Sequence, residues 1–552
     1  MKRKQVITLL VALSVTAGTL SGCGSVISKS DTAVQSAPVS EAEYYEEPCE
    51  EPAEIEYEEA ADYAETFDIA PAGTCEEACS TSLESAKAAP ANRSYLDSIY
   101  DYDSSRPENT EEYSALEEIG FKSVKRSPLS TFAADVDTAS YSNMRRMITD
   151  GYSIDNFPEG SIRIEELINY FNYDYKGPRG KEPFGVNTVI GDCPWNGDAK
   201  LLSIGLKTED IDFEDTPDSN LVFLIDVSGS MFSDDKLPLL QDAFCMLVDE
   251  LSEKDRVSIV TYAGCDSVVL KGVSGDKHSK IKNAINDLEA GGSTNGSAGI
   301  VTAYKLAERY FIKGGNNRVI LATDGDLNVG LTSVSELEDL ISDKKESGVF
   351  LSVLGFGSGN IKDNRMETLA DKGNGNYAYI DSKREAKKVL VKELSANLLT
   401  VCKDVKFQVE FNPEVVEKYR LIGYSNRVMA NKDFDDDTKD GGEIGAGHTV
   451  TALYELILNE DSDDTILNLN IRFKKPSEET SKLLTYPVDF SSYKRNPGDD
   501  FCFQSAVAEF GLIASHSEYP EDADLDDVID ILESIELNDE YKEEFLELVQ
   551  YI

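Results

Sequence analysis

The sequence predicts an α/β domain with a doubly wound, mostly parallel sheet between residues 219 and 398. Residues 221–225, 319–322 and 349–354 form near-continuous apolar runs, as strands do when both faces of their sheet are covered. Segments with apolar residues at helical spacing separate these runs. Regular alternation of strands and helices is typical of a doubly wound sheet.

The elements of this domain are predicted in order along the chain. Strands are predicted at residues 221–226, 256–262, 268–270, 319–324, 349–357 and 376–380. Helices are predicted at residues 237–251, 279–288, 298–311, 334–345 and 384–398. Parallel strands bring their carboxyl ends to one edge of the sheet, where ligands bind in open α/β folds.

Two of the apolar strands end in an acid, and polar loops lie next to them. The first runs into Asp226, followed by Ser228 and Ser230, and the second runs into Asp324. Thr294 lies in a Gly-rich loop between two predicted helices. Carboxylate and hydroxyl oxygens are hard donors, which suit Mg²⁺. The Asp-x-Ser-x-Ser string alone also fits an ordinary strand end with a polar turn.

Together, these three parts resemble the metal-ion-dependent adhesion site of von Willebrand factor type A (VWA) domains. The resemblance implies that Ser228, Ser230 and Thr294 contact Mg²⁺ or Mn²⁺, whereas Asp226 and Asp324 bind it mostly through water. It also implies one open coordination position, which an acidic side chain of a protein partner fills. We therefore expect this cation as the cofactor and an acidic protein surface as the partner.

The overall composition narrows the classes of partner. The chain has 552 residues, enough for about three domains. A formal net charge of −50 argues against nucleic-acid binding and against adsorption to anionic lipid. The three histidines are far apart, and no His-Glu-x-x-His string occurs. A zinc hydrolase and a Ser-His-Asp hydrolase are therefore not predicted.

The N-terminus carries a targeting pattern. Lys2, Arg3 and Lys4 precede a short apolar stretch at residues 6–20, which is too short to span a bilayer. Leu20-Ser-Gly-Cys23 resembles a bacterial lipobox, which implies removal of residues 1–22 and acylation of Cys23. We expect an extracytoplasmic, membrane-anchored lipoprotein. An ordinary secretory signal with a coincidental cysteine is the alternative.

Residues 23–112 are predicted to form an acidic, unstructured tether. Residues 41–68 are dense in Glu and Asp and contain no Lys or Arg. Such a segment cannot bury enough apolar surface to fold, and self-repulsion extends it. A calcium-binding acidic tail is the alternative function for this segment.

Residues 113–198 are predicted to form an N-terminal domain with helices at 141–148 and 162–171. Asp135-x-Asp137 after apolar residues resembles the first motif of haloacid-dehalogenase-type phosphatases. That resemblance implies a nucleophile at Asp135 and an acid/base at Asp137. However, Ala139 stands at the Thr position of that motif, and the later acidic pair and lysine of the family have no clear counterpart.

Residues 401–552 are predicted to form a β-sandwich-like and helical module. Strands are predicted at 404–411, 449–458 and 465–473, and residues 501–552 read as helical. The strings Asp135-Val-Asp-Thr-Ala-Ser-Tyr141 and Glu443-Ile-Gly-Ala-Gly-His448 resemble bacterial YfbK-type VWA lipoproteins. This resemblance extends from about residue 127 to the C-terminus.

The leading functional hypothesis is a surface-anchored, non-enzymatic protein that binds a partner through the cation. The first alternative is an assembly or scaffolding factor of the cell envelope that uses the same site within a complex. The second is a phosphatase that uses Asp135 and Asp137.

Overall fold

The computed structural model describes residues 109–552 except 116, 135–136, 213, 215, 264–265, 293–295, 326–333, 440, 460–464, 477 and 521. The predicted signal peptide, Cys23 and residues 23–108 of the predicted tether therefore lie outside the described residues, as do Thr294 and Asp135. No helix within the described part of the chain is long and apolar enough to cross a membrane.

The predicted α/β domain is present, with a six-stranded sheet in the order β10-β9-β8-β5-β6-β7. Its strands are β5 (Ser219–Asp226), β6 (Arg256–Tyr262), β7 (Asp266–Ser274), β8 (Asn316–Thr323), β9 (Phe350–Phe356) and β10 (Tyr377–Ile380). All neighbours are parallel except β7, which pairs antiparallel to β6 at the edge. β7 is longer than the predicted edge strand at residues 268–270.

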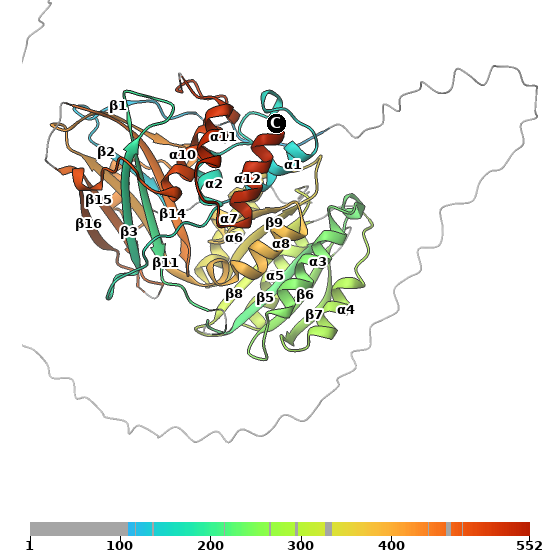
Figure 1. Ribbon diagram of the computed structural model, residues 1–552. Helices are drawn as coiled ribbons and strands as arrows, with labels where there is room; N and C mark the ends of the chain where they lie inside the picture. The colour runs from blue at the N-terminus through green and yellow to red at the C-terminus, as the bar shows by residue number, and fades with distance from the viewer. Residues whose placement is uncertain are drawn as a thin grey trace, which may run out of the picture. The chain divides into compact units, whose positions relative to one another are not determined.

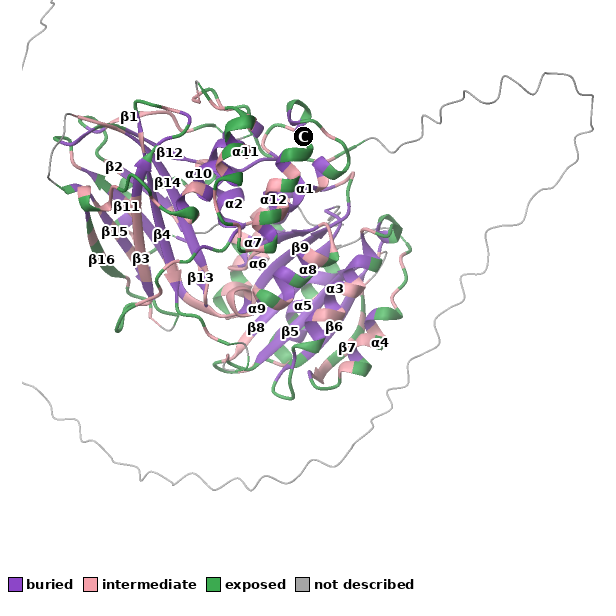
Figure 2. Ribbon diagram, viewed as in Figure 1, coloured by how far each residue is buried: buried purple, intermediate pink, exposed green. Residues whose placement is uncertain are grey.

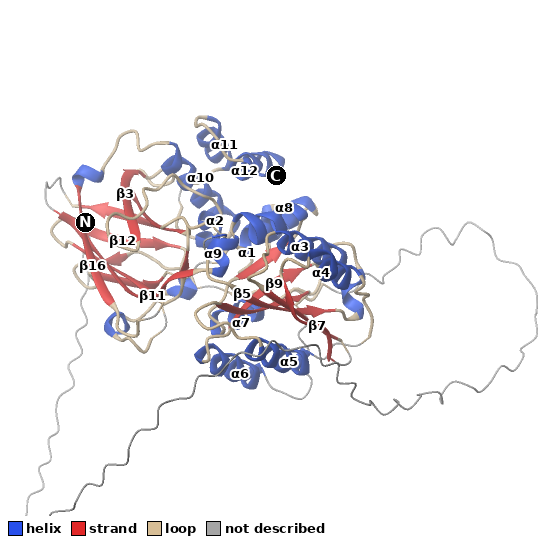
Figure 3. Cartoon of the chain, turned by 90° about the horizontal axis from the view of Figure 1, so that it is seen from below, coloured by secondary structure: helices blue, strands red, loops and turns tan. Residues whose placement is uncertain are grey.

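Helices cover both faces of this sheet. Those of the domain are α3 (Leu237–Asp249), α4 (His278–Asn286), α5 (Gly296–Arg309), α6 (Val334–Glu346), α7 (Asp363–Lys372), α8 (Lys383–Lys387) and α9 (Leu394–Leu398). Side chains alternate along β5: Phe223 packs in one core with residues of α3 and α4, whereas Leu224 packs in another with residues of α5, α6 and α7. Figure 3 shows the sheet between α3 and α4 on one side and α5 and α6 on the other.

The prediction differs from the structure at two helices of this domain. The predicted helix at residues 384–398 is interrupted by a π-helical turn, Lys388–Lys392, between α8 and α9. Helix α7 was not predicted, because its sequence is mostly polar and offers few apolar residues at helical spacing.

A β-sandwich lies beside this domain (Figure 1). One sheet has the order β1-β12-β14-β4-β3, and the other has the order β13-β11-β15-β16 with β2 paired to β11. The strands preceding the α/β domain are β1 (Lys122–Ser123), β2 (Leu129–Ala133), β3 (Phe184–Asp192) and β4 (Lys200–Thr208). Those following it are β11 (Thr400–Phe411), β12 (Val416–Ile422), β13 (Ile444–Gly445), β14 (Thr449–Leu458), β15 (Thr465–Lys474) and β16 (Lys482–Asp489).

The two predicted flanking domains thus share this sandwich. Strand β4 pairs with β14 from Lys200 opposite Leu456 to Lys207 opposite Thr449. The core of the sandwich contains aromatic residues that precede the α/β domain in the sequence and others that follow it. For example, Phe132 stacks on Phe407, with ring centroids 5.0 Å apart. The strand patterns at residues 113–198 and 401–552 do not specify a partner strand, so pairing between strands this far apart in the sequence was not predicted.

A helical layer also draws on both ends of the chain. It contains α1 (Ala139–Thr149), α2 (Ile164–Asn169), α10 (Asp499–Ala514), α11 (Leu525–Glu533) and α12 (Glu540–Tyr551), which share one hydrophobic core. Most residues of α10 are buried, including the polar Gln504 and Glu509. Figure 2 shows α2 and the middle strands of the sheets in the buried colour.

Buried ion pairs join these layers to the α/β domain. Arg145 of α1 pairs with Asp381 at 2.5 Å, with Glu385 of α8 at 2.7 Å and with Glu544 of α12 at 2.9 Å. Arg427 pairs with Asp371 of α7 at 2.8 Å. The pairs of Arg145 with Asp381 and Glu385 are buried on both sides, so removing either partner would leave a buried charge without its counter-ion.

The predicted tether ends earlier than residue 112. The backbone N–H of Thr110 donates to Gly359 O at 2.8 Å, and that of Glu112 donates to Ile361 O at 2.8 Å. The Glu111 carboxylate accepts from the backbone N–H of Gly359 at 2.8 Å. Residues 109–112 are thus bonded to the α/β domain, because the backbone ahead of α7 offers them partners.

Candidate metal centre

The parallel strands bring the two predicted acids to one edge of the sheet. Asp226 is the last residue of β5, and Asp324 directly follows β8. β5 and β8 are neighbours in register, with Ile225 opposite Ala322. Both acids are fully buried. The sequence prediction that Asp226 and Asp324 share this edge is confirmed by the strand order.

Asp226 is oriented by hydrogen bonds to both of its carboxylate oxygens. Oδ1 accepts from the backbone N–H of Ser228 at 2.9 Å, and Oδ2 accepts from the Thr323 hydroxyl at 3.1 Å. Burial raises the pKa of Asp226 to about 6 despite the hydrogen bonds from Ser228, and the charge of Asp324 contributes to the rise. A nearby cation would favour the charged carboxylate.

The hydroxyls of Ser228 and Ser230 lie next to each other, just after Asp226 in the chain. Their Oγ atoms lie 2.9 Å apart. Ser228 is buried, whereas Ser230 and the intervening Gly229 are exposed. The short 3-10 turn Gly229–Phe232 places these residues directly after β5. The pair therefore lies between the buried acids and solvent.

Thr294 lies outside the described residues, but the start of its loop is held at the site. The backbone N–H of Gly229 donates to Gly292 O at 3.1 Å, and the N–H of Gly291 donates to Val227 O at 2.8 Å. Gly291 and Gly292, which precede Thr294 in the sequence, are thus bonded to the residues on either side of Ser228. The place of Thr294 in the metal site stays a prediction.

Asp324 has a positively charged neighbour that was not predicted. Lys236 Nζ lies 2.9 Å from Asp324 Oδ2 and 2.9 Å from Asn360 Oδ1. Burial acts to raise the pKa of Asp324, but the Lys236 ammonium outweighs it and holds that pKa below its ordinary value. A lysine ten positions after Asp226 belongs to no pattern that indicates this contact, so the contact could not be predicted.

Tyr262, at the end of β6, is a second neighbour that was not predicted. Burial raises its pKa well above the ordinary value, and the Asp226 carboxylate raises it further. Its hydroxyl is buried and has no hydrogen-bond partner among the described residues. The edge of the sheet thus holds an unpaired polar atom as well as two acids.

The donor set fits a hard divalent cation. Within the described ranges, no group of three or more His, Cys, Asp or Glu residues could hold a metal. A cation here would therefore depend on the Ser228 and Ser230 hydroxyls in addition to the two acids. Such an all-oxygen set with few carboxylates suits Mg²⁺ or Mn²⁺ rather than Zn²⁺.

Known family models match three successive parts of the chain. Residues 220–394 match the von Willebrand factor type A domain, and residues 107–203 match a family described as von Willebrand factor. Residues 396–552 match the C-terminal region of "Uncharacterized protein YfbK". The protein of that name from Escherichia coli (strain K12) is 42% identical over 436 residues, which cover 74% of this chain and 75% of that protein. The chain belongs to the YfbK family of VWA proteins.

Other proteins are similar to this chain at lower sequence identity. Human inter-alpha-trypsin inhibitor heavy chain H4 is 28% identical over 150 residues, which cover 26% of this chain and 16% of that protein. A solved structure, "von Willebrand factor type A from Catenulispora acidiphila", aligns with a TM-score of 0.40 and 13% identity over 69% of this chain and 91% of that one. The VWA domain indicates a general role in protein–protein interaction or adhesion.

Asp137, the second acid of the predicted phosphatase motif, has structural partners in this YfbK-family chain. Its Oδ1 accepts from the backbone N–H of Tyr377 at 2.9 Å, and its Oδ2 accepts from Arg427 Nη2 at 3.3 Å. The residue is 5% exposed. Asp137 thus links the segment before α1 to strand β10, and its buried position offers a substrate little access.

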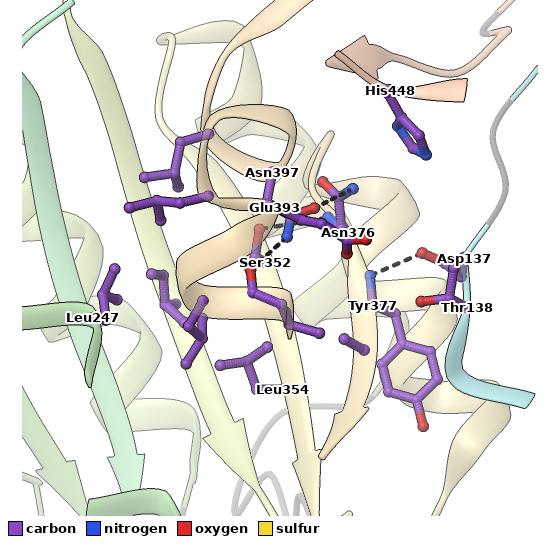
Figure 4. A pocket seen from close by; sticks show the side chains of 16 residues that line it. Asp137, Thr138, Leu247, Ser352, Leu354, Asn376, Tyr377, Glu393, Asn397 and His448 are labelled. Carbon is purple, nitrogen blue, oxygen red and sulfur yellow. Dashed lines mark hydrogen bonds between the residues drawn. The ribbon is translucent and has the colours of Figure 1, made fainter. Parts of the chain in front are cut away.

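A small cavity lies at the other edge of the VWA sheet, near the amino ends of β9 and β10 (Figure 4). Its volume is about 60 Å³, enough for only a few waters. Its polar groups bond within the protein: the Ser352 hydroxyl accepts from Arg318 at 2.6 Å, and Asn376 donates to Asn397 at 3.4 Å. We assign no ligand to this cavity.

Proposed function

We propose that the VWA domain binds Mg²⁺ or Mn²⁺ and, through it, an acidic side chain of a protein partner. Ser228, Ser230 and Thr294 would contact the cation, and Asp226 and Asp324 would support it. The observation that carries this proposal is the pair of hydroxyls 2.9 Å apart, next to the buried Asp226 carboxylate that accepts from the Ser228 backbone. The family supports the interaction role, and the oxygen donors support the choice of metal.

Neutral ligands are central to this proposal. Hydroxyls donate little charge, so a cation held mainly by Ser228 and Ser230 would keep most of its charge. When bound, such a cation supplies an electron-poor, open coordination position for an incoming carboxylate. The exposure of Ser230 gives that carboxylate a path from solvent.

The rim of the site indicates what surrounds the partner's acidic residue. Phe232, two positions after Ser230, is 81% exposed, although large apolar side chains are usually covered. Asp234 is exposed beside it and Asp235 is half-buried, and both would repel an acidic partner in the absence of a cation. We therefore expect a partner carboxylate next to apolar surface, and strict dependence on the cation.

We also propose that the protein is an extracytoplasmic lipoprotein, acylated at Cys23. This rests on the lipobox-like Leu20-Ser-Gly-Cys23 after a short apolar stretch.

Crosslinking in cells tests the proposal. Wild-type protein is expected to give a crosslinked partner that EDTA removes and that Asp226→Ala does not form, with Asp276→Ala, an exposed acid of the same domain, as the control. A partner that persists in EDTA and with Asp226→Ala would contradict it. A stable complex of several proteins, dependent on the same residue, would instead favour the assembly-factor alternative.

A further inference from the structure

Lys236 places a positive charge next to Asp324 in the buried part of the candidate site. Its Nζ lies 2.9 Å from Asp324 Oδ2, and the residue is 7% exposed. Lysine is rarely buried in proteins unless its charge is paired. The second partner, Asn360 Oδ1, also lies at 2.9 Å, so two oxygens hold the ammonium in this position.

The backbone near Lys236 leaves room for its side chain. Lys236 directly precedes α3, and its carbonyl accepts from the N–H of Leu240 at 2.9 Å. Its aliphatic stem passes over Gly357, where a Cβ would come within 2.3 Å of Lys236 Cγ. Gly357 has φ +74°, a conformation that favours glycine. A side chain at position 357 would therefore collide with the stem of Lys236 in this position.

We propose that Lys236 is a resident cation that competes with the divalent metal for Asp324 and keeps the metal affinity of the site low. This inference rests on the proposed metal site. When the metal is absent, the positive charge of Lys236 balances the negative charge of Asp324, so that the residues around the site keep their positions. When the metal is present, the ammonium withdraws an oxygen of Asp324 from it and repels its charge.

Metal titration of Lys236→Met tests the competition. Methionine keeps an unbranched apolar stem over Gly357 but removes the charge. In the full chain, calorimetric titration with MnCl₂ is expected to show about 10-fold tighter binding by Lys236→Met than by wild type. Lys344→Met is the matched control, since Lys344 of α6 forms a 2.6 Å ion pair with Glu308 of α5 and both side chains are partly exposed. Its affinity for Mn²⁺ is expected to equal that of wild type.

Melting in EDTA supplies a second readout that needs no metal. Lys236→Met is expected to melt several degrees below wild type, because Asp324 stays buried without its cation. Mn²⁺ is then expected to raise the melting temperature of Lys236→Met more than that of wild type. Binding by both proteins with equal affinity, or weaker binding by Lys236→Met, would overturn the competition alone. Absence of binding by either protein would overturn the proposed metal site and the competition with it.

Discussion

Arg163 Nη1 donates a 2.6 Å hydrogen bond to Asp363 Oδ2, across 200 positions of sequence. Both side chains are 2% exposed. Arg163 directly precedes α2 in the helical layer, whereas Asp363 is the first residue of α7 in the VWA domain. Arg163 also pairs with Glu166, so one guanidinium is bonded to two buried carboxylates where the two parts meet.

Arg163→Met is therefore expected to destabilise the protein strongly. It leaves Asp363 and Glu166 buried without their cation, and breaking such a pair costs about 3–5 kcal/mol. Guanidinium denaturation, followed by tryptophan fluorescence or circular dichroism, measures the shift in midpoint. Lys282→Met, which breaks a surface pair with Asp249, is the control and is expected to cost less than about 1 kcal/mol. Equal midpoints for Arg163→Met and wild type would contradict the role of this contact.

Stability is expected to depend on pH through Glu509 in α10. Burial raises its pKa from 4.5 to about 7, and the charges of Asp527 and Asp524 add to this. The folded state thus binds a proton that the unfolded chain releases, so stability is lost as pH rises from about 4.5 to about 7. Glu509→Gln has no carboxyl to titrate at this position, so it is expected not to lose this stability as pH rises.

The comparison of Glu509→Gln with wild type measures this effect. The denaturation midpoint of Glu509→Gln is expected to exceed that of wild type at pH 8 by more than it does at pH 5. The same difference at both pH values would show that Glu509 does not titrate in this range.

Phe232 is expected to contribute to partner binding but not to folding. It is 81% exposed, so Phe232→Ser removes little internal packing and leaves the melting temperature and Mn²⁺ affinity unchanged. The yield of cation-dependent crosslinked partner is expected to fall several-fold. Phe311→Ser, at an exposed phenylalanine just after α5, is the control with unchanged yield. Equal yields for the two variants would remove Phe232 from the proposed surface.

Cys23→Ser is expected to abolish membrane anchoring. The lipobox-like sequence requires the thiol, because acylation takes place on that atom. Cell fractionation is expected to show wild type with the membranes, and mass spectrometry of its mature N-terminus is expected to show a lipid adduct. A wild-type N-terminus without lipid, together with membrane association of Cys23→Ser, would contradict the anchor.

The sequence predicted the VWA sheet well because its strands carry strong local patterns. The apolar run into Asp226 requires burial on both faces, and β5 is buried along its whole length. Parallel pairing then brings Asp324 to the same edge. The apolar runs indicate the strands, and their alternation with helices indicates a parallel sheet, so the shared edge could be predicted without the structure.

Features that depend on distant pairing could not be read in this way. The pairing of β4 with β14 joins segments on either side of the VWA domain, and neither strand specifies its partner. The contact between Lys236 and Asp324 likewise depends on the path of a flexible side chain over Gly357. The sequence therefore predicted that Asp226 and Asp324 share one edge of the sheet, but not the contact of Lys236 with Asp324.

Calorimetric titration of wild type and Asp226→Ala with MnCl₂ tests the central claim most directly. Asp226→Ala removes a buried carboxylate that orients the Ser228 backbone, while the strand and its core stay intact. The account predicts that wild type binds one Mn²⁺ and that Asp226→Ala binds it about 10- to 100-fold more weakly. Asp276→Ala is expected to match wild type. Equal affinities for wild type and Asp226→Ala, or no binding by wild type, would contradict the metal site and the function built on it.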